Sequence, residues 1–210
     1  MLDTIARQFN AGGPFMWVIL VVLAVACAVV VERLIFYFVI CRSQGVRMAA
    51  ELAKAMNAGS TDEARRIVCC RKAPVDVLLR TAFERFDADM PVEDIREGVE
   101  EAAIREMPKM SQRLNYLALF ANIATLLGLL GTISGLQVSF SSLAAVEATQ
   151  KATMLARGIS QAMNTTAFGL IVAVPCMIMY TMLSNLRERK VKDLDEAVVR
   201  TLNYFKKKRS

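Results

Sequence analysis

Residues 126–140 read LLGLLGTISGLQVSF, an apolar stretch with a narrow face of small and hydroxylic side chains. Helical spacing through this stretch and its flanks gives that face as Ala118, Ala121, Thr125, Gly128, Thr132, Gly135, Ser139 and Ser142. A face without large side chains lets another helix backbone come close, which is how helices associate in lipid. The pattern therefore predicts a membrane-embedded helix that packs tightly on a neighbour.

A second apolar stretch, GISQAMNTTAFGLIVAVPCMIMY at residues 158–180, repeats this design. Its small residues share one helical face: Gly158, Ala162, Thr166, Gly169, Ala173 and Cys176. Two such faces, each with a threonine, predict a bundle with a tight and slightly polar interior.

The charges are segregated from the apolar residues. Hydrophobic residues make up 55% of the 210 positions and charged residues 22%, with a mean hydropathy of +0.37. Residues 15–31, 114–146 and 158–186 contain no Asp, Glu, Lys or Arg. A helix of about 20 residues crosses a hydrocarbon core. We therefore expect an all-α membrane protein with three transmembrane helices, the longer of which extend into a cytoplasmic helical domain.

Positive charge predicts the orientation. Half of the 26 lysines and arginines lie in residues 41–113, and most of the others follow residue 186. These two segments are expected on the cytoplasmic side. The expected division is an outer amphipathic tail (1–13), a first span (14–41), a cytoplasmic insert (42–112), a second span (113–143), a short outer loop (144–156), a third span (157–186) and a cytoplasmic C-terminal helix with a basic tail (187–210).

Composition argues against several functions. The chain has no histidine, and its five cysteines offer no second pair at metal-ligand spacing, so we expect no metal site, no cofactor and no enzyme. The basic residues of the insert alternate with acids and lack interleaved aromatics, so no nucleic-acid partner is expected.

Glu32 and Arg33 interrupt the first span near its cytoplasmic end. Charges at that depth are costly unless they reach headgroups or a partner. Two interpretations remain open, an interfacial anchor and a buried ion pair between subunits.

The sequence of the cytoplasmic insert predicts helices at residues 46–57, 60–70 and 75–86, and a fourth helix that begins near residue 89. The fourth helix has an apolar stripe comprising Val92, Ile95, Val99, Ala103 and Ile104. Pro108 is expected to kink its junction with the second span.

Residues 84–106 hold nine acids against three arginines. They predict either a solvated face or a docking surface for a cytoplasmic partner. The C-terminal stripe Val191, Leu194, Val198, Leu202 and Phe205 is expected to pack on neighbouring subunits.

The stretches LFANIATLLGLLGTISGLQVSF (119–140) and LARGISQAMNTTAFGLIVAVPCMIMY (155–180), with Glu32-Arg33 closing the first span, resemble the MotA/TolQ/ExbB proton-channel family. The resemblance is to its TolQ/ExbB branch and covers all three spans. It implies a homopentamer in the bacterial inner membrane, with a periplasmic N-terminus and a cytoplasmic C-terminus. The ring would enclose an ExbD/TolR-like partner dimer of single-span chains whose membrane aspartate carries protons.

The same resemblance assigns roles to residues. Thr132 and Thr166 would line the pore, with Thr165 and Gln161 also on the proton pathway. Pro175 would bend the third span. Gly128, Gly131 and Gly135 would permit close helix packing. The small face of the third span adds Gly158, Ala162, Gly169 and Ala173 to the expected packing residues.

Gln161 departs from the family, since members of the ExbB type often carry glutamate there. The difference hints at a specialised branch such as a gliding-motility motor.

The leading hypothesis is a stator-like subunit that couples proton motive force to mechanical work or transport across the envelope, acting on an envelope-spanning or cytoplasmic effector. A non-conducting oligomeric membrane scaffold is the alternative.

Overall fold

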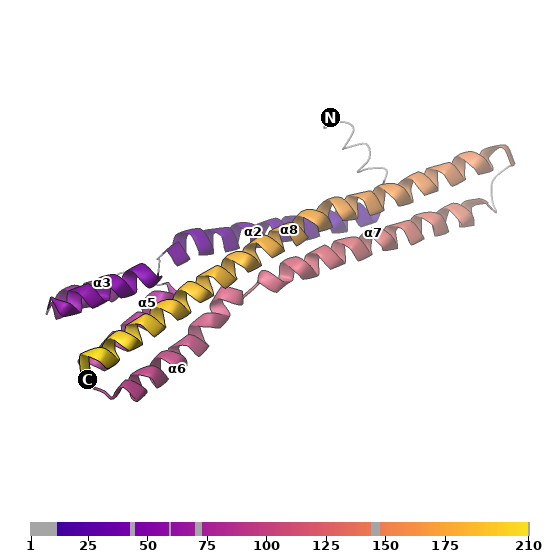
Figure 1. Cartoon of the computed structure of the whole chain (residues 1–210). Helices are drawn as coiled ribbons and strands as arrows, with labels where there is room; N and C mark the ends of the chain where they lie inside the picture. The colour runs from indigo at the N-terminus through magenta and orange to yellow at the C-terminus, as the bar shows by residue number, and fades with distance from the viewer. Residues whose placement is uncertain (1–11, 43–44, 59, 70–72, 144–147, 210) are drawn as a thin grey trace. The chain divides into compact units, whose positions relative to one another are not determined.

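The computed structural model describes residues 12–42, 45–58, 60–69, 73–143 and 148–209. Every regular element within them is a helix. The tail expected at residues 1–13 lies almost wholly outside the described residues, as do residues 144–147 of the expected outer loop. In chain order the elements are α2 (Pro14–Val39), the short 3-10 helix η1 (Ile40–Arg42), α3 (Gly45–Asn57), α4 (Thr61–Cys69), α5 (Pro74–Asp87), α6 (Val92–Ser111), α7 (Leu114–Leu143) and α8 (Ala148–Arg209) (Figure 1).

Three helices correspond to the three expected spans, since α2, α7 and α8 are each long and apolar enough to cross a membrane. The chain forms two compact units. The first unit comprises residues up to Val31 together with Arg113–Met182, and the second comprises Glu32–Gln112 with Leu183–Ser210.

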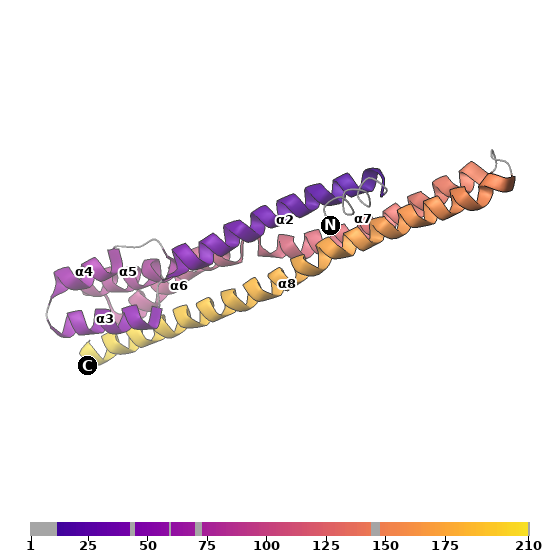
Figure 2. The ribbon, with the colours of Figure 1, turned by 90° about the horizontal axis from the view of Figure 1, so that it is seen from above.

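In the first unit, α7 and α8 run side by side in both views (Figures 1 and 2). Their small residues are buried between them, whereas large side chains such as Leu126 and Ile171 point outward. The N-terminal end of α2 buries Met16 and Ile19 and exposes Trp17 and Val21. An exterior of large apolar side chains suits contact with lipid tails.

The helix α8 is longer than the sequence predicted. It begins at Ala148 and continues through Pro175 to Arg209, for 62 residues. It therefore occupies most of the expected loop 144–156. Its continuation beyond residue 186 agrees with the expectation that the longer spans extend into a cytoplasmic helical domain. The early start has a local cause, because residues 148–156 (ATQKATMLA) are mostly good helix formers.

The second unit has a core of large apolar side chains. Leu52, Leu79, Phe83, Ile95 and Phe205 are each at most 1% exposed. Helices α3, α5, α6 and the C-terminal part of α8 all contribute to it. The stripe of α8 that we expected to contact neighbouring subunits packs here instead, with Leu194 and Phe205 buried in the core of its own chain. The prediction of an apolar stripe was right, but the predicted partner was wrong, because periodicity does not show which chain covers an apolar face.

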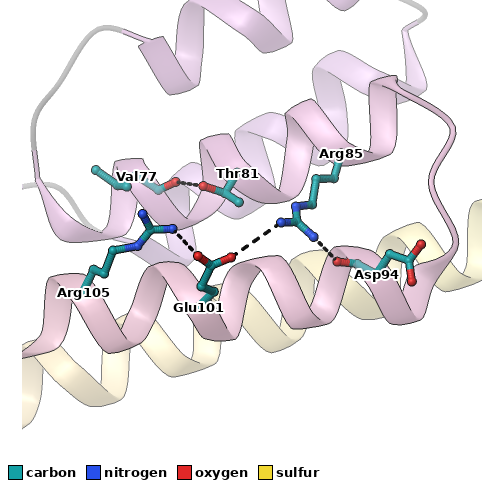
Figure 3. A network of polar contacts seen from close by, with 6 residues as sticks. All are labelled: Val77, Thr81, Arg85, Asp94, Glu101 and Arg105. Atoms are coloured by element: carbon teal, nitrogen blue, oxygen red, sulfur yellow. Dashed lines mark hydrogen bonds and ion pairs between the residues drawn. The ribbon is translucent and has the colours of Figure 1, made fainter.

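Hydrogen bonds and ion pairs connect α5 to α6, which follow one another across a short turn (Figure 3). Arg85 on α5 donates to the Asp94 carbonyl at 2.7 Å and lies 3.9 Å from Glu101. Glu101 also pairs with Arg105 at 2.8 Å. Asp89 in the turn has φ +58°, a left-handed conformation that aspartate tolerates better than most residues.

The end of α6 differs from the prediction. The helix continues past Pro108 to Ser111, and the Gln112 amide donates to the Pro108 carbonyl at 2.9 Å. Proline lacks an amide hydrogen but its carbonyl still accepts, so the helix can close one more turn. The helical run breaks at Gln112 and Arg113, where φ of Arg113 is +61°.

Candidate functional site

Helices α7 and α8 of the first unit approach each other closely along a seam of small residues. We define this seam by Ala124, Gly128, Gly131, Gly135 and Ser139 of α7 and by Gly158, Ala162, Thr165, Thr166 and Gly169 of α8. The two helices meet in antiparallel register, since Gly169 contacts Ala124, Gly128 contacts Thr166, and Gly135 contacts Ala162.

Glycine permits this approach because several contacts are made by backbone atoms. A Cβ atom on Gly169 would lie 2.7 Å from the Ala124 carbonyl oxygen and 3.1 Å from the Gly128 Cα. A Cβ on Gly128 would lie 3.3 Å from the Thr166 Cα. Backbone atoms of a packed helix pair cannot rotate away as a side chain can, so a methyl group at Gly169 requires the helices to separate.

Side chains close the rest of the seam. A Cβ on Gly131 would lie 2.8 Å from the Thr165 Cβ, and one on Gly158 would overlap the Ser139 side chain. Ala162 and Ala173 of α8 are buried at 4% and 5% exposure. The predicted packing residues therefore lie on buried faces of α7 and α8, with the exception of Pro175, which is exposed.

Three hydroxyl groups donate hydrogen bonds to backbone carbonyls within the seam. Thr165 is fully buried, and its Oγ1 lies 2.9 Å from the Gln161 carbonyl and 3.0 Å from that of Gly12. Thr166 Oγ1 donates across the seam to the Gly128 carbonyl at 3.1 Å. Ser139 donates to the Gly135 carbonyl at 2.9 Å. A hydroxyl whose hydrogen is donated keeps lone pairs, so these groups can still accept a hydrogen bond.

The other predicted pathway residues lie beside the seam. Thr132 is half-buried, and its hydroxyl donates to the Leu129 carbonyl of its own helix at 2.6 Å. Gln161 is also half-buried, with its side-chain amide against Gly13, the residue just before α2. Gly13 has φ +76°, which favours glycine, and a Cβ there would lie 2.5 Å from the Gln161 Nε2.

The buried face of α7 is rotated slightly from the predicted one. It passes through Ala124 and Gly131, whereas Thr125 is exposed and Thr132 is half-buried. Ala124 was missed, and Gly131 did not lie on the face first drawn through Thr132. The sequence contained the information to place them. Ala124 lies three positions after Ala121, and Gly131 lies three positions after Gly128. A step of three residues keeps to one helix face as well as the step of four that led to Thr125 and Thr132.

In the second unit, Glu32 and Arg33 form an ion pair within one chain at 3.1 Å. Arg33 is 3% exposed, donates to the Lys109 carbonyl at 3.3 Å and stacks on Phe36. The Glu32 side chain is 41% exposed. Arg33 thus faces its own protein, at the C-terminal turn of α6 where unpaired carbonyls favour a cation.

The described residues contain no group of three or more Cys, Asp and Glu side chains arranged to hold a metal ion. Between residues 158 and 186, α8 has no acid or base, and neither does α7 along its whole length. The seam can therefore offer hydroxyls, amides and carbonyls, but no carboxylate.

The chain thus has three candidate membrane spans, and two of them, α7 and α8, pack closely through glycines and threonine and serine hydroxyls. This combination indicates a membrane protein with a weakly polar helix pair. The chain belongs to the MotA/TolQ/ExbB proton channel family, whose model matches residues 71–196. The matched region includes α5, α6, α7 and most of α8.

Individual relatives come from the TolQ/ExbB branch. The chain is 33% identical over 119 residues to the Tol-Pal system protein TolQ of Pseudomonas aeruginosa, covering 52% of this chain and 51% of the relative. It is 41% identical over 91 residues to the biopolymer transport protein exbB1 of Vibrio cholerae, covering 43% and 38%. It is 28% identical over 148 residues to the biopolymer transport protein ExbB of Salmonella typhimurium, covering 66% and 60%. The matches thus span about half the length of these relatives.

Proposed function

We propose that the chain is a proton-channel subunit of the bacterial inner membrane that couples proton motive force to work or transport across the cell envelope. It would do so as a homopentamer around an ExbD/TolR-like dimer of single-span chains. Membership of a proton channel family and the similarity to TolQ and ExbB proteins support this proposal. Its N-terminus would be periplasmic and its C-terminus cytoplasmic.

The observation that carries the proposal is the α7–α8 seam, which places hydroxyl groups in a span without acids or bases. Threonine hydroxyls cannot hold a proton at neutral pH, although they can hydrogen-bond to a group that does. A proton pathway along these helices therefore needs a titrating group from another chain. An aspartate on the membrane helix of the partner would supply it.

Hydrogen-bond directions suggest how the threonines act. Both Thr132 and Thr166 give their hydroxyl hydrogen to a backbone carbonyl. In this state each can accept a hydrogen bond from a protonated carboxyl group, but cannot donate to a carboxylate. Rotation of the hydroxyl away from its carbonyl would allow donation. The threonines would thus favour the protonated acid in one rotamer and the ionised acid in another.

The energies involved are of similar size. A charged carboxylate in a span costs a few kcal/mol, about 2.5 to 3.5 at the helix centre on insertion scales. A proton moving through the membrane potential gains about 2.3 kcal/mol per 100 mV. A hydrogen bond contributes about 1 kcal/mol net and more when one group is charged. A change of hydroxyl rotamer is therefore large enough to bias loading and release of the proton.

The ring would place α7 and α8 inside and α2 outside. α2 presents large apolar side chains such as Trp17, Val21 and Val25 to its surroundings. Glycines concentrate instead on α7 and α8, where close contact is made.

The test is proton flux into liposomes that contain the chain with an aspartate-bearing single-span partner. We expect flux that requires both chains and stops when the partner's aspartate is replaced by asparagine. An intact oligomer that binds the partner and passes no protons under a potential would favour the scaffold alternative. A stable monomer by native mass spectrometry would contradict the ring itself.

A further inference from the structure

An apolar groove lies in the second unit between α5, α6 and α8, with a volume of about 510 Å³. Its floor is buried, with Leu78, Val99 and Leu194 at 3% exposure or less. The complete lining is Leu78, Val99, Glu100, Ala103, Ile104, Met107, Leu194, Asp195, Val198 and Val199.

Two large apolar side chains of this groove are exposed. Ile104 on α6 is 74% exposed and Val199 on α8 is 55% exposed. Ile104 belongs to the stripe that the sequence predicted on one apolar face, yet it lies on the open side of the groove. Outside α2 and η1, Met90 is the only other large apolar residue of this unit that is exposed among the described residues. Outside α2 and η1, the exposed large apolar side chains of this unit are thus concentrated at the groove.

The charge at the groove is negative. Glu100 and Asp195 line it, and none of the lining residues is basic. Glu100 pairs with Arg96 at 2.9 Å, but both side chains are more than 60% exposed. Exposed pairs of this kind are weak, so Glu100 remains available to a stronger partner.

A second copy of the chain fits this surface poorly. Two grooves placed face to face would bring Glu100 and Asp195 against the same acids of the other copy. A contact between two different faces would need another exposed apolar patch. Exposed apolar residues at positions 35–40 belong to the expected first span, and the rest of the described part of this unit offers only Met90. Both arguments favour a different polypeptide.

We propose that the groove binds an amphipathic helix of a partner protein, with lysines or arginines flanking the helix's apolar face. Such helices dock by apolar anchors spaced three or four residues apart, which here would contact Ile104 and Val199. The flanking cations would meet Glu100 and Asp195 and fix the orientation of the helix. This proposal is independent of proton conduction.

The test uses the full chain in nanodiscs of zwitterionic lipid and two fluorescent model helices of about 18 residues, long enough for five turns. One helix has a leucine face flanked by lysines, and the other has the same leucine face flanked by glutamates. We expect fluorescence anisotropy to detect binding of the lysine helix above that of empty nanodiscs, and no such binding of the glutamate helix.

Variants locate the binding. Ile104→Ser combined with Val199→Ser changes only exposed side chains and is expected to weaken binding by about tenfold, since buried apolar area drives such contacts. Glu100→Gln combined with Asp195→Asn is expected to weaken it about fivefold at low salt and much less at high salt, where charges are screened. The matched control, Glu93→Gln with Glu97→Gln, removes the same charge from exposed α6 positions outside the groove and is expected to change binding less than twofold.

Three results would each overturn the proposal. Neither helix binds, or the glutamate helix binds as well as the lysine helix, or the groove variants bind as strongly as the control. A photo-crosslinking amino acid at position 104 provides a second readout. Crosslinks to the lysine helix support the groove as its site, whereas crosslinks to a second copy of the chain would show that this copy occupies it.

Discussion

The two units of this chain solve the packing of helices in different ways. In the α7–α8 seam, Gly128 and Gly169 bring backbone atoms of two helices into direct contact. In the second unit, large side chains such as Phe83 and Phe205 fill the space between helices. The first solution suits lipid, where burying a large apolar side chain gains little, and the second suits water, where it gains much. The difference predicts that the same type of substitution has different effects in the two units.

The largest expected effect is the loss of a core side chain from the second unit. Phe83→Ala leaves a cavity at a site that is 1% exposed, and we expect a loss of about 3 to 5 kcal/mol in the free energy of unfolding. Denaturant unfolding followed by circular dichroism measures it. Ile104→Ala in the same unit is the matched control, because Ile104 is 74% exposed, and should change stability by under about 0.5 kcal/mol.

Gly169→Ala tests the seam from the opposite direction, by adding one methyl group. The new Cβ would lie 2.7 Å from the Ala124 carbonyl, so we expect destabilisation of about 1 to 3 kcal/mol and separation of α7 from α8. A spin-label distance between the two helices would show the separation. Unchanged distance and stability would mean that the helices do not rely on glycine contacts.

A smaller effect is expected at the first turn of α3. Asp193 of α8 accepts hydrogen bonds from the Gly45 amide at 2.8 Å and the Val46 amide at 3.4 Å, which lack partners within their own helix. Asp193→Ala should cost about 1 to 2 kcal/mol of unfolding free energy, as for other lost caps. Asp193→Asn keeps an acceptor and should retain part of this stability. Equal losses for both variants would contradict the capping role.

The smallest expected effect comes from a glycine outside the seam. The three atoms nearest to a Cβ on Gly98 of α6 belong to the guanidinium of Arg85, the end of a long side chain that can move aside. Alanine also favours helix by about 1 kcal/mol, which offsets the disturbed contacts of Arg85. We therefore expect Gly98→Ala to change the free energy of unfolding by less than about 1 kcal/mol. A loss as large as that of Gly169→Ala would remove the distinction between the two units.

Sequence reasoning predicted the helical class, three helices long enough to span a membrane and all five glycines of the seam, because charge segregation and small-residue spacing leave few alternatives. It did not separate Thr165 from Thr166. Adjacent residues lie about 100° apart on a helix, and packing buries Thr165 completely while Thr166 reaches across to Gly128. The start of α8 at Ala148 was missed because a loop was expected at residues 144–156, whereas its extension beyond the third span was predicted. The exposure of Ile104 could not be predicted, because periodicity defines a face without showing what covers it.

The central claim is that the threonine hydroxyls on and beside the seam act on a proton carrier and do more than pack helices. The most direct measurement is proton flux in liposomes containing the partner chain, compared among Thr166→Val, Thr132→Val and the control Thr181→Val. Thr181 is an exposed α8 residue whose hydroxyl also donates to its own helix, to the Met177 carbonyl at 2.9 Å. Valine has nearly the shape of threonine but no hydroxyl. We predict that Thr166→Val and Thr132→Val abolish flux while partner binding stays normal, that serine at either position restores part of it, and that Thr181→Val conducts normally. Full flux in both Thr166→Val and Thr132→Val, with the partner's aspartate still required, would contradict the claim.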